Sequence, residues 1–80
     1  MSNSAELSDS LVRVIREHRL AKKFSMYQLA KLSGLDKSAI GKLEAGLRAP
    51  SVETADKIAK ALGVPLWQMI REAENLRKKS

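Results

Sequence analysis

The stretch from Phe24 to Gly46, FSMYQLAKLSGLDKSAIGKLEAG, constrains the fold more than any other part of the chain, because it carries the signals of two short helices and a tight turn. Ser25 can cap the first helix by accepting a backbone N–H, and Gln28 can reach back to the N–H of Ser25. Gly34 can supply the positive φ of a tight corner. Asp36 can cap the second helix, where its charge also suits the helix dipole.

The two predicted helices each have an apolar face. Leu29 and Leu32 are expected to be the buried stripe of the first helix, and Ile40 and Leu43 that of the second. The other face of the second helix is basic and small, with Lys37, Ser38, Gly41 and Lys42. A basic helix that faces outward in this way is suited to the major groove of DNA.

The remaining segments also predict helices. Residues 1–7 are small and polar, so we expect them to be frayed. A first helix should begin after Ser8 or Asp9 and run to about Lys22, with three residues on one face: Leu11, Ile15 and His18. Ser51 should cap a fourth helix that Gly63 ends, with a buried stripe of Val52, Ala55, Ile58, Ala59 and Leu62.

A fifth helix should follow Pro65, which suits a first helical turn because its missing N–H is harmless there. Its apolar positions recur at helical spacing before a basic tail at 77–80: Leu66, Met69, Ile70, Ala73 and Leu76. No segment predicts a strand, an internal repeat or a second domain. The sequence therefore predicts an all-α fold, a compact five-helix bundle in a single domain at 8–80.

Length and composition agree with this fold. Eighty residues fit one domain near the lower size limit for a self-sufficient core, and 44% of them are apolar. Fifteen Lys and Arg against nine acids give a net charge of +6, which favours a polyanionic partner but is shared by many unrelated basic proteins. The chain has no Cys, which excludes disulfides and thiolate-bound metals. With no membrane-length apolar run and no signal-peptide pattern, we expect a cytoplasmic protein without a membrane partner.

The chain resembles the phage repressor/Cro-type (XRE) helix-turn-helix family over roughly residues 11–70. The matching positions are Ile15, Arg19, Leu29-Ala30, Gly34-Leu35, Ile40, Leu43-Glu44, Gly46, Arg48, Pro50-Ser51 and the run at 57–64. The resemblance implies a bundle of five helices that binds operator DNA sequence-specifically as a dimer.

The family's pattern assigns base contacts to the outward face of the second helix of the motif. Lys37 and Lys42 can donate to guanine O6 and N7, and Ser38 can donate or accept. Ala39 can touch a thymine methyl. Gly41 allows close approach, at a helix cost of about 1 kcal/mol relative to Ala. The alternative is that the two lysines form an ordinary solvated face.

The resemblance also implies phosphate contacts, which position the protein without specifying sequence. Here they fall on Ser25, Met26, Gln28, Arg48 and the backbone near Ser51. Met26 departs from the family, which commonly has a Gln there that binds a phosphate. Either the contact shifts to Tyr27 or Gln28, or Met26 packs on sugar or base methyl groups.

Arg19 and Glu44 occupy positions that form a semi-buried ion pair in the family. Such a pair would join the first helix to the end of the third through a planar, bidentate contact. The alternative is an unpaired surface arginine.

The single histidine, His18, lies on the apolar stripe of the first helix. Glu17, the nearest residue that could be a second metal ligand, points elsewhere, so a histidine at the core edge is favoured over a metal ligand. The sequence has no nucleophile–base pair, phosphate-binding Gly loop or paired carboxylates. We therefore expect no enzyme activity, cofactor or small-molecule ligand.

Trp67 is expected at the rim of the fifth helix. Together with the outer edges of Leu66 and Ile70 it would form a small apolar patch, suited to a homodimer. The alternative is that Trp67 folds back over its own core.

Two functions remain. The first is a sequence-specific transcriptional regulator: a restriction–modification controller, a phage-type repressor, an antitoxin or a small autoregulator. The second is a protein-interaction adaptor that keeps the fold without base contacts. An adaptor would show acidic or bulky apolar residues across 37–42, where this chain is basic and small.

Overall fold

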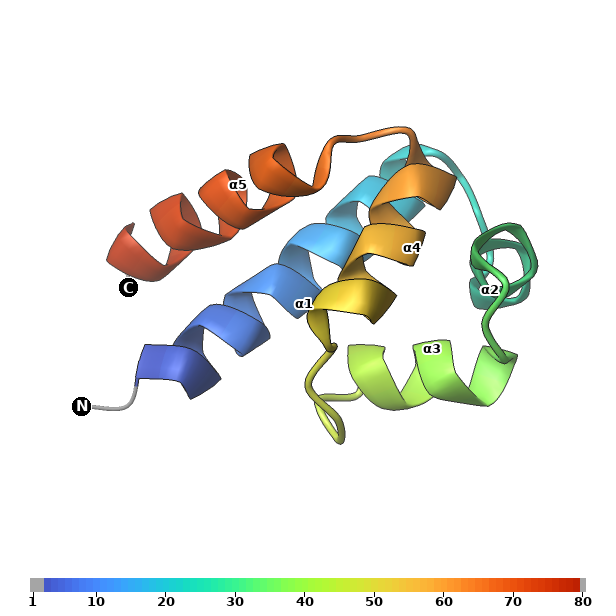
Figure 1. Cartoon of the computed structure of the whole chain (residues 1–80), viewed down its shortest axis with the longest axis horizontal. Helices are drawn as coiled ribbons and strands as arrows, with labels where there is room; N and C mark the ends of the chain where they lie inside the picture. The colour runs from blue at the N-terminus through green and yellow to red at the C-terminus, as the bar shows by residue number, and fades with distance from the viewer. Residues whose placement is uncertain (1–2, 80) are drawn as a thin grey trace.

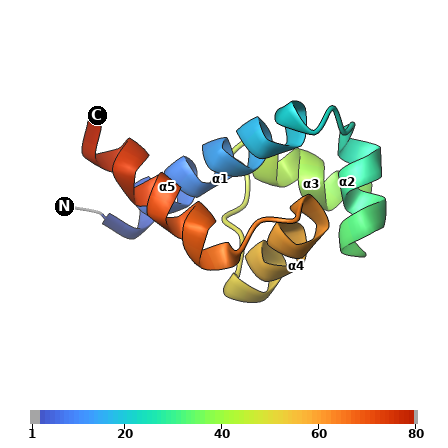
Figure 2. The same cartoon turned by 90° about the horizontal axis from the view of Figure 1, so that it is seen from above.

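The computed structural model describes residues 3–79 of the chain. Over this range it contains five helices and no strand: α1 (Asn3–Ala21), α2 (Met26–Ser33), α3 (Lys37–Glu44), α4 (Val52–Leu62) and α5 (Leu66–Lys79). Helices α1 and α5 pack side by side and run in opposite directions. Helices α2 and α3 lie at the end of the molecule opposite the start of α1 and the end of α5 (Figures 1 and 2). The predicted all-α, five-helix fold is confirmed.

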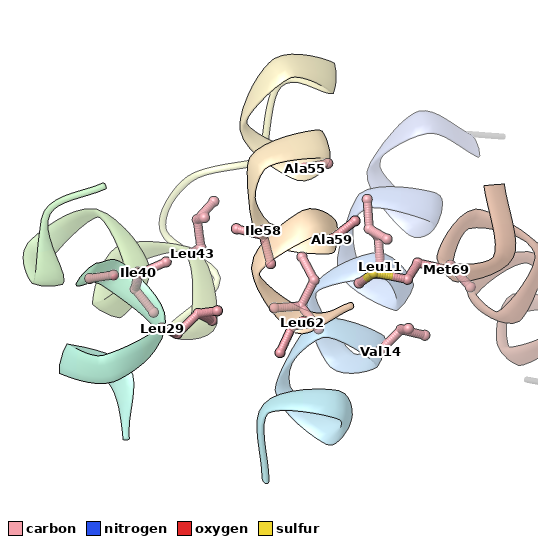
Figure 3. Packing of buried hydrophobic residues seen from close by; sticks show 13 residues of the cluster. Leu11, Val14, Leu29, Ile40, Leu43, Ala55, Ile58, Ala59, Leu62 and Met69 are labelled. Carbon is pink, nitrogen blue, oxygen red and sulfur yellow. The ribbon is translucent and has the colours of Figure 1, made fainter. Parts of the chain in front are cut away.

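The core draws on all five helices. Helix α4 lies between the α2–α3 pair and the α1–α5 pair, and its side chains face both (Figure 3). The largest fully buried side chains are Ile15, Leu29, Ile40, Ile58, Leu62 and Met69. Full burial of one such side chain stabilises the fold by about 1.5–3 kcal/mol. The α2–α3 unit is therefore anchored by its own buried side chains, such as Leu29 and Ile40, which join the same core as α4.

Capping residues define the ends of the short helices. The hydroxyl of Ser51 accepts the N–H of Thr54 over 3.0 Å at the start of α4. Gly34 lies at the corner between α2 and α3 and has a φ of 75°, a backbone conformation that residues with a side chain rarely adopt. Asp36 stands at the N-cap position of α3, but its side chain makes no cap hydrogen bond. Its contribution there is the negative charge at the helix N-terminus.

Two residues predicted to be buried are exposed. Leu32 is 58% exposed, because the buried face of α2 is formed by Leu29, Ala30 and Ser33, and the centre of that face lies more than a quarter-turn around the helix from Leu32. Val52 is 76% exposed, because it is the first residue of α4 and core contact begins one turn later, at Ala55.

The outer helices are longer than predicted. α1 begins at Asn3 instead of after Ser8 or Asp9, and Leu7, one turn before Leu11, packs on the core. The segment expected to be frayed therefore overlaps α1 from residue 3 onward, while residues 1 and 2 lie outside the described range. α5 continues to Lys79 and so includes most of the predicted basic tail. Ser80 also lies outside the described range.

Candidate nucleic-acid interface

Helix α3 is fixed on one side and open on the other. Ile40 and Leu43 are buried at 1% and 2% exposure, whereas Lys37, Ser38 and Lys42 are exposed. The helix lies along the edge of the molecule, as Figure 1 shows. Two further predicted contact residues, Ala39 and Gly41, are partly exposed. The five residues expected to contact bases are thus all at least partly exposed on α3.

The fold does not require the glycine at Gly41. A Cβ placed there meets no heavy atom within 4 Å, and the residue lies inside a helix without positive φ. Glycine in a helix interior costs about 1 kcal/mol relative to alanine. By contrast, Gly34, Gly46 and Gly63 all have φ near 75° and serve the turns. Gly41 leaves the α3 backbone open to a ligand.

The start of α2 carries the predicted capping box. Ser25 N–H donates to Gln28 Oε1 over 2.8 Å, and Gln28 N–H donates to Ser25 Oγ over 3.0 Å. The cap uses only acceptor atoms of these two side chains. The hydroxyl of Ser25 and the amide N–H₂ of Gln28 remain as donors, and both residues are exposed.

Met26 is half-buried and packs against the hydrophobic core. Its neighbour Tyr27 is 60% exposed. The side chain that departs from the family pattern therefore contacts the protein's own core, while Tyr27 and Gln28 are the accessible polar groups of this turn.

A buried ion pair holds α3 to α1. Arg19 Nε donates to Glu44 Oε2 over 2.7 Å and Arg19 Nη2 donates to Glu44 Oε1 over 2.8 Å, with the Glu44 side chain only 1% exposed. Arg19 Nη1 also donates to the carbonyl of Phe24 over 2.8 Å, just before α2. The bond to Glu44 raises the pKa of the Arg19 guanidinium. One arginine thereby fixes both helices of the motif.

The sequence reasoning missed a second arginine at this carboxylate. Arg16 Nε lies 3.6 Å from Glu44 Oε1, and its side chain is 54% exposed. The spacing of three residues between Arg16 and Arg19 on one helix could have indicated a shared partner.

The predicted loop contacts lie beside α3. A hollow of about 330 Å³ lies between α3 and the start of α4. Arg48 and Ser51 line it together with Ala39. Its complete lining is Leu35, Ala39, Leu43, Arg48, Ala49, Pro50, Ser51 and Thr54. Residues predicted for phosphates and for bases thus border one hollow.

Positive charge is concentrated in this half of the chain. Residues 18–52 hold seven Lys and Arg and two acids, a net +5 of the chain's +6. One of the two acids, Glu44, is buried in its ion pair. Residues 53–80 hold six basic and four acidic residues. The surface around α2 and α3 is therefore the part most suited to a polyanion.

Histidine 18 has a partner that the sequence did not reveal. It is half-buried, and its Nε2 forms a 2.7 Å hydrogen bond with Glu72 Oε1 on α5. Glu72 Oε2 also accepts from Gln68 Nε2 over 3.2 Å. The bond to His18 is the main reason why the pKa of Glu72 is lowered, against an opposing effect of burial. The pair joins α1 to α5.

Trp67 does not cover its own core. It is 64% exposed on the first turn of α5, whereas Leu66 and Ile70 are partly buried and pack on the core.

Among residues 3–79, no cluster of three or more His, Asp or Glu side chains could hold a metal ion. None of the described helices has the length and apolar character to cross a membrane.

Comparison with known proteins gives consistent matches. The model of a helix-turn-helix family matches residues 15–66. The HTH-type transcriptional regulator SlrR of Bacillus subtilis (strain 168) is 38% identical over 65 residues, and the cryptic phage CTXphi transcriptional repressor RstR of Vibrio cholerae is 30% identical over 60 residues. These matches cover 80% and 75% of this chain but 42% and 54% of the relatives, so the chain spans about half of their length.

A solved structure is similar over more of its length. The restriction-modification controller protein C.AhdI from Aeromonas hydrophila is 38% identical, with a TM-score of 0.73, and the match covers 81% of this chain and 97% of that one.

Proposed function

Because the chain belongs to the helix-turn-helix family, we propose that it is a transcriptional regulator that binds operator DNA with α3 in the major groove. The main support for this proposal is that one face of α3 is buried against the protein while its basic face is exposed. The helix is held from behind by Ile40, Leu43 and the Arg19–Glu44 pair, and it presents exposed Lys37 and Lys42 in the most basic part of the chain.

Base contacts in this proposal come from the exposed face of α3. Lys37 and Lys42 donate to guanine O6 and N7, and Ser38 donates or accepts. Ala39 contacts a thymine methyl, and Gly41 lets the DNA approach the helix backbone. The open space at the position that a Cβ of residue 41 would occupy supports the last role.

Phosphate contacts come from the residues that surround α3. The free donors of Ser25 and Gln28 and the guanidinium of Arg48 suit phosphate oxygens, as do the backbone N–H groups near Ser51 at the start of α4. The packing of Met26 on the core supports a shift of the family's usual contact to Gln28, with Met26 as its support.

A homodimer completes the proposal. One α3 specifies only a few base pairs, whereas two related by a two-fold axis and spaced by about 34 Å specify a palindrome. The exposed Trp67, with the outer edges of Leu66 and Ile70, is the surface proposed for self-association. The patch is small, so we expect dimerisation in the micromolar range, about −8 kcal/mol.

The adaptor alternative has less support. An adaptor without base contacts does not need an exposed basic helix or a glycine on the exposed side of that helix. SlrR is named as a transcriptional regulator and RstR as a transcriptional repressor. In bacteria such a function requires a cytoplasmic location.

The experiment that tests the proposal separates base contacts from phosphate contacts. Operator sequences are first selected by the wild-type protein from a random duplex library. Lys42→Ala should then cost about 1–3 kcal/mol on the selected operator and relax base preference at one position per half-site. Arg48→Ala should weaken binding to all sequences alike. Equal losses on operator and random DNA for both variants would remove Lys42 from the base contacts.

A further inference from the structure

The hollow between α3 and the start of α4, which we call the α3–α4 hollow, has a largely apolar wall. Five of its eight described lining residues are apolar: Leu35, Ala39, Leu43, Ala49 and Pro50. Leu43 is buried, whereas Ala49 is exposed. Among the described residues, Arg48 is the only charged one in the lining. This wall suits an apolar group better than a charged one.

The hydroxyl groups in the lining are engaged in the cap of α4. The Ser51 hydroxyl donates to Thr54 Oγ1 over 3.0 Å and accepts the backbone N–H of Thr54 over the same distance. A phosphate pressed against the apolar wall would lose hydration without matching hydrogen bonds. Phosphates therefore suit Arg48 and the backbone near Ser51, and the wall is left for another part of the nucleotide.

The proposed DNA contacts lie on both sides of the α3–α4 hollow. Ala39 lines it from α3 and is proposed to contact a base, whereas Arg48 and the backbone near Ser51 are proposed to contact phosphates. Figure 1 shows α3 and the loop before α4 along the same edge of the molecule. A nucleotide that reaches from one set of contacts to the other turns the major-groove edge of its base toward the apolar wall.

The chemistry of that edge determines which group the α3–α4 hollow can take. Bases present hydrogen-bond donors and acceptors in the major groove, and the one apolar group among them is the C5-methyl of thymine. Cytosine acquires the same group at the same carbon when it is methylated. A C5-methylpyrimidine is therefore the base that matches the wall.

We propose that the α3–α4 hollow is a subsite for the C5-methyl group of one pyrimidine in each half-site, so that operator binding depends on methylation at that carbon. This inference rests on the proposed function. It extends the contact of Ala39 to a site that Ala39 forms jointly with Ala49 and Pro50. At a thymine the methyl group is part of the operator sequence. At a cytosine it is added by a C5-methyltransferase, and binding then responds to the methylation state of the DNA.

The test compares operator duplexes that differ by one methyl group in each half-site. Each thymine of the selected operator is replaced in turn by uracil, and each cytosine in turn by 5-methylcytosine. Fluorescence anisotropy gives the ratio of affinities with and without the methyl group at each position. Ala49→Val and Ala49→Leu enlarge a side chain that lines the hollow, and Ala21→Leu is the matched control at an exposed alanine of α1 outside it. Circular dichroism checks the fold.

One pyrimidine position in each half-site should respond. There the methyl group should raise the affinity of the wild-type protein about fourfold per half-site, as expected for burying one methyl. Ala49→Val should lower this ratio, and Ala49→Leu should bring it close to one. Ala21→Leu should keep the wild-type ratio. A response at a thymine assigns the subsite to sequence recognition, and a response at a cytosine assigns it to recognition of methylation.

The other outcomes separate this inference from the proposed function. If no position responds while Lys42→Ala still weakens operator binding, the methyl subsite is wrong and the proposed function stands. If a position responds but Ala49→Leu keeps the wild-type ratio, the methyl group lies outside the α3–α4 hollow and the inference is overturned. If the wild-type protein selects no operator, the proposed function itself fails.

Discussion

The α2–α3 region and the α1–α5 pair are held together by contacts of different range. In the α2–α3 region the defining bonds join residues close in sequence, such as Ser25 and Gln28, three positions apart. In the α1–α5 pair, the hydrogen bond between His18 and Glu72 joins residues 54 positions apart, beside apolar packing between the two helices. The buried ion pair of Arg19 with Glu44 joins α1 to α3, and both regions also pack on α4.

The two regions also differ in whether their polar side chains are exposed or bonded to each other. The α2–α3 region presents exposed Lys37, Ser38 and Lys42, and it has a glycine at 41, where an added Cβ would meet no heavy atom within 4 Å. In the α1–α5 pair, the half-buried His18 and Glu72 bond each other. We infer that the first region is the one that contacts the proposed DNA, while the second supports and positions it.

The largest expected effect comes from breaking the connection between the regions. Arg19→Ala leaves the buried Glu44 carboxylate poorly compensated and should lower the free energy of unfolding by about 3–5 kcal/mol. Arg16→Ala, at a side chain 54% exposed, should cost less than about 1 kcal/mol. Urea unfolding followed by circular dichroism measures both. Equal, small losses would mean that Arg16 can replace Arg19, and the pair would not be the main connection.

The second largest expected effect is on dimerisation, through the proposed dimer surface on α5. Trp67→Ala should weaken dimerisation by about 2 kcal/mol or more, as for a central aromatic anchor, while helical circular dichroism stays nearly unchanged. Leu20→Ala, at an exposed leucine on α1, is the matched control and should stay dimeric. Analytical sedimentation distinguishes them. A Trp67 variant that remains dimeric would place the interface elsewhere, and one that unfolds would show that Trp67 belongs to the core.

The smallest expected effect is at Gly41, where one substitution should change stability and operator binding in opposite directions. Gly41→Ala should raise the stability of the fold by about 1 kcal/mol, because alanine favours the helix and has room there. It should nevertheless weaken operator binding, because the methyl group occupies the surface that DNA approaches. Asn75→Ala on α5, also uncharged and exposed, should stabilise without affecting binding. Unchanged affinity in Gly41→Ala would show that no ligand comes close to that position.

Much of the α2–α3 region was predictable because its signals are local. The capping box at Ser25 and the turn at Gly34 follow from residue types a few positions apart. The Arg19–Glu44 pair was implied only by the family resemblance, since its partners are 25 positions apart. Periodicity alone placed Leu32 in the core, because it cannot tell which edge of a short helix other helices cover. The His18–Glu72 bond had no sequence signal, because it depends on how α5 folds back along α1.

The assignment of DNA binding to the basic α2–α3 region is tested most directly by the salt dependence of binding. A labelled duplex of random sequence is titrated with the protein between 0.05 and 0.3 M NaCl, and the affinity is read by fluorescence anisotropy. If the exposed Lys37, Lys42 and Arg48 each neutralise a phosphate on random DNA, as the proposed function requires, log affinity should fall against log salt with a slope of about −3 or steeper per subunit. Lys60→Ala on α4 should leave the slope unchanged. A flat wild-type titration would contradict the assignment.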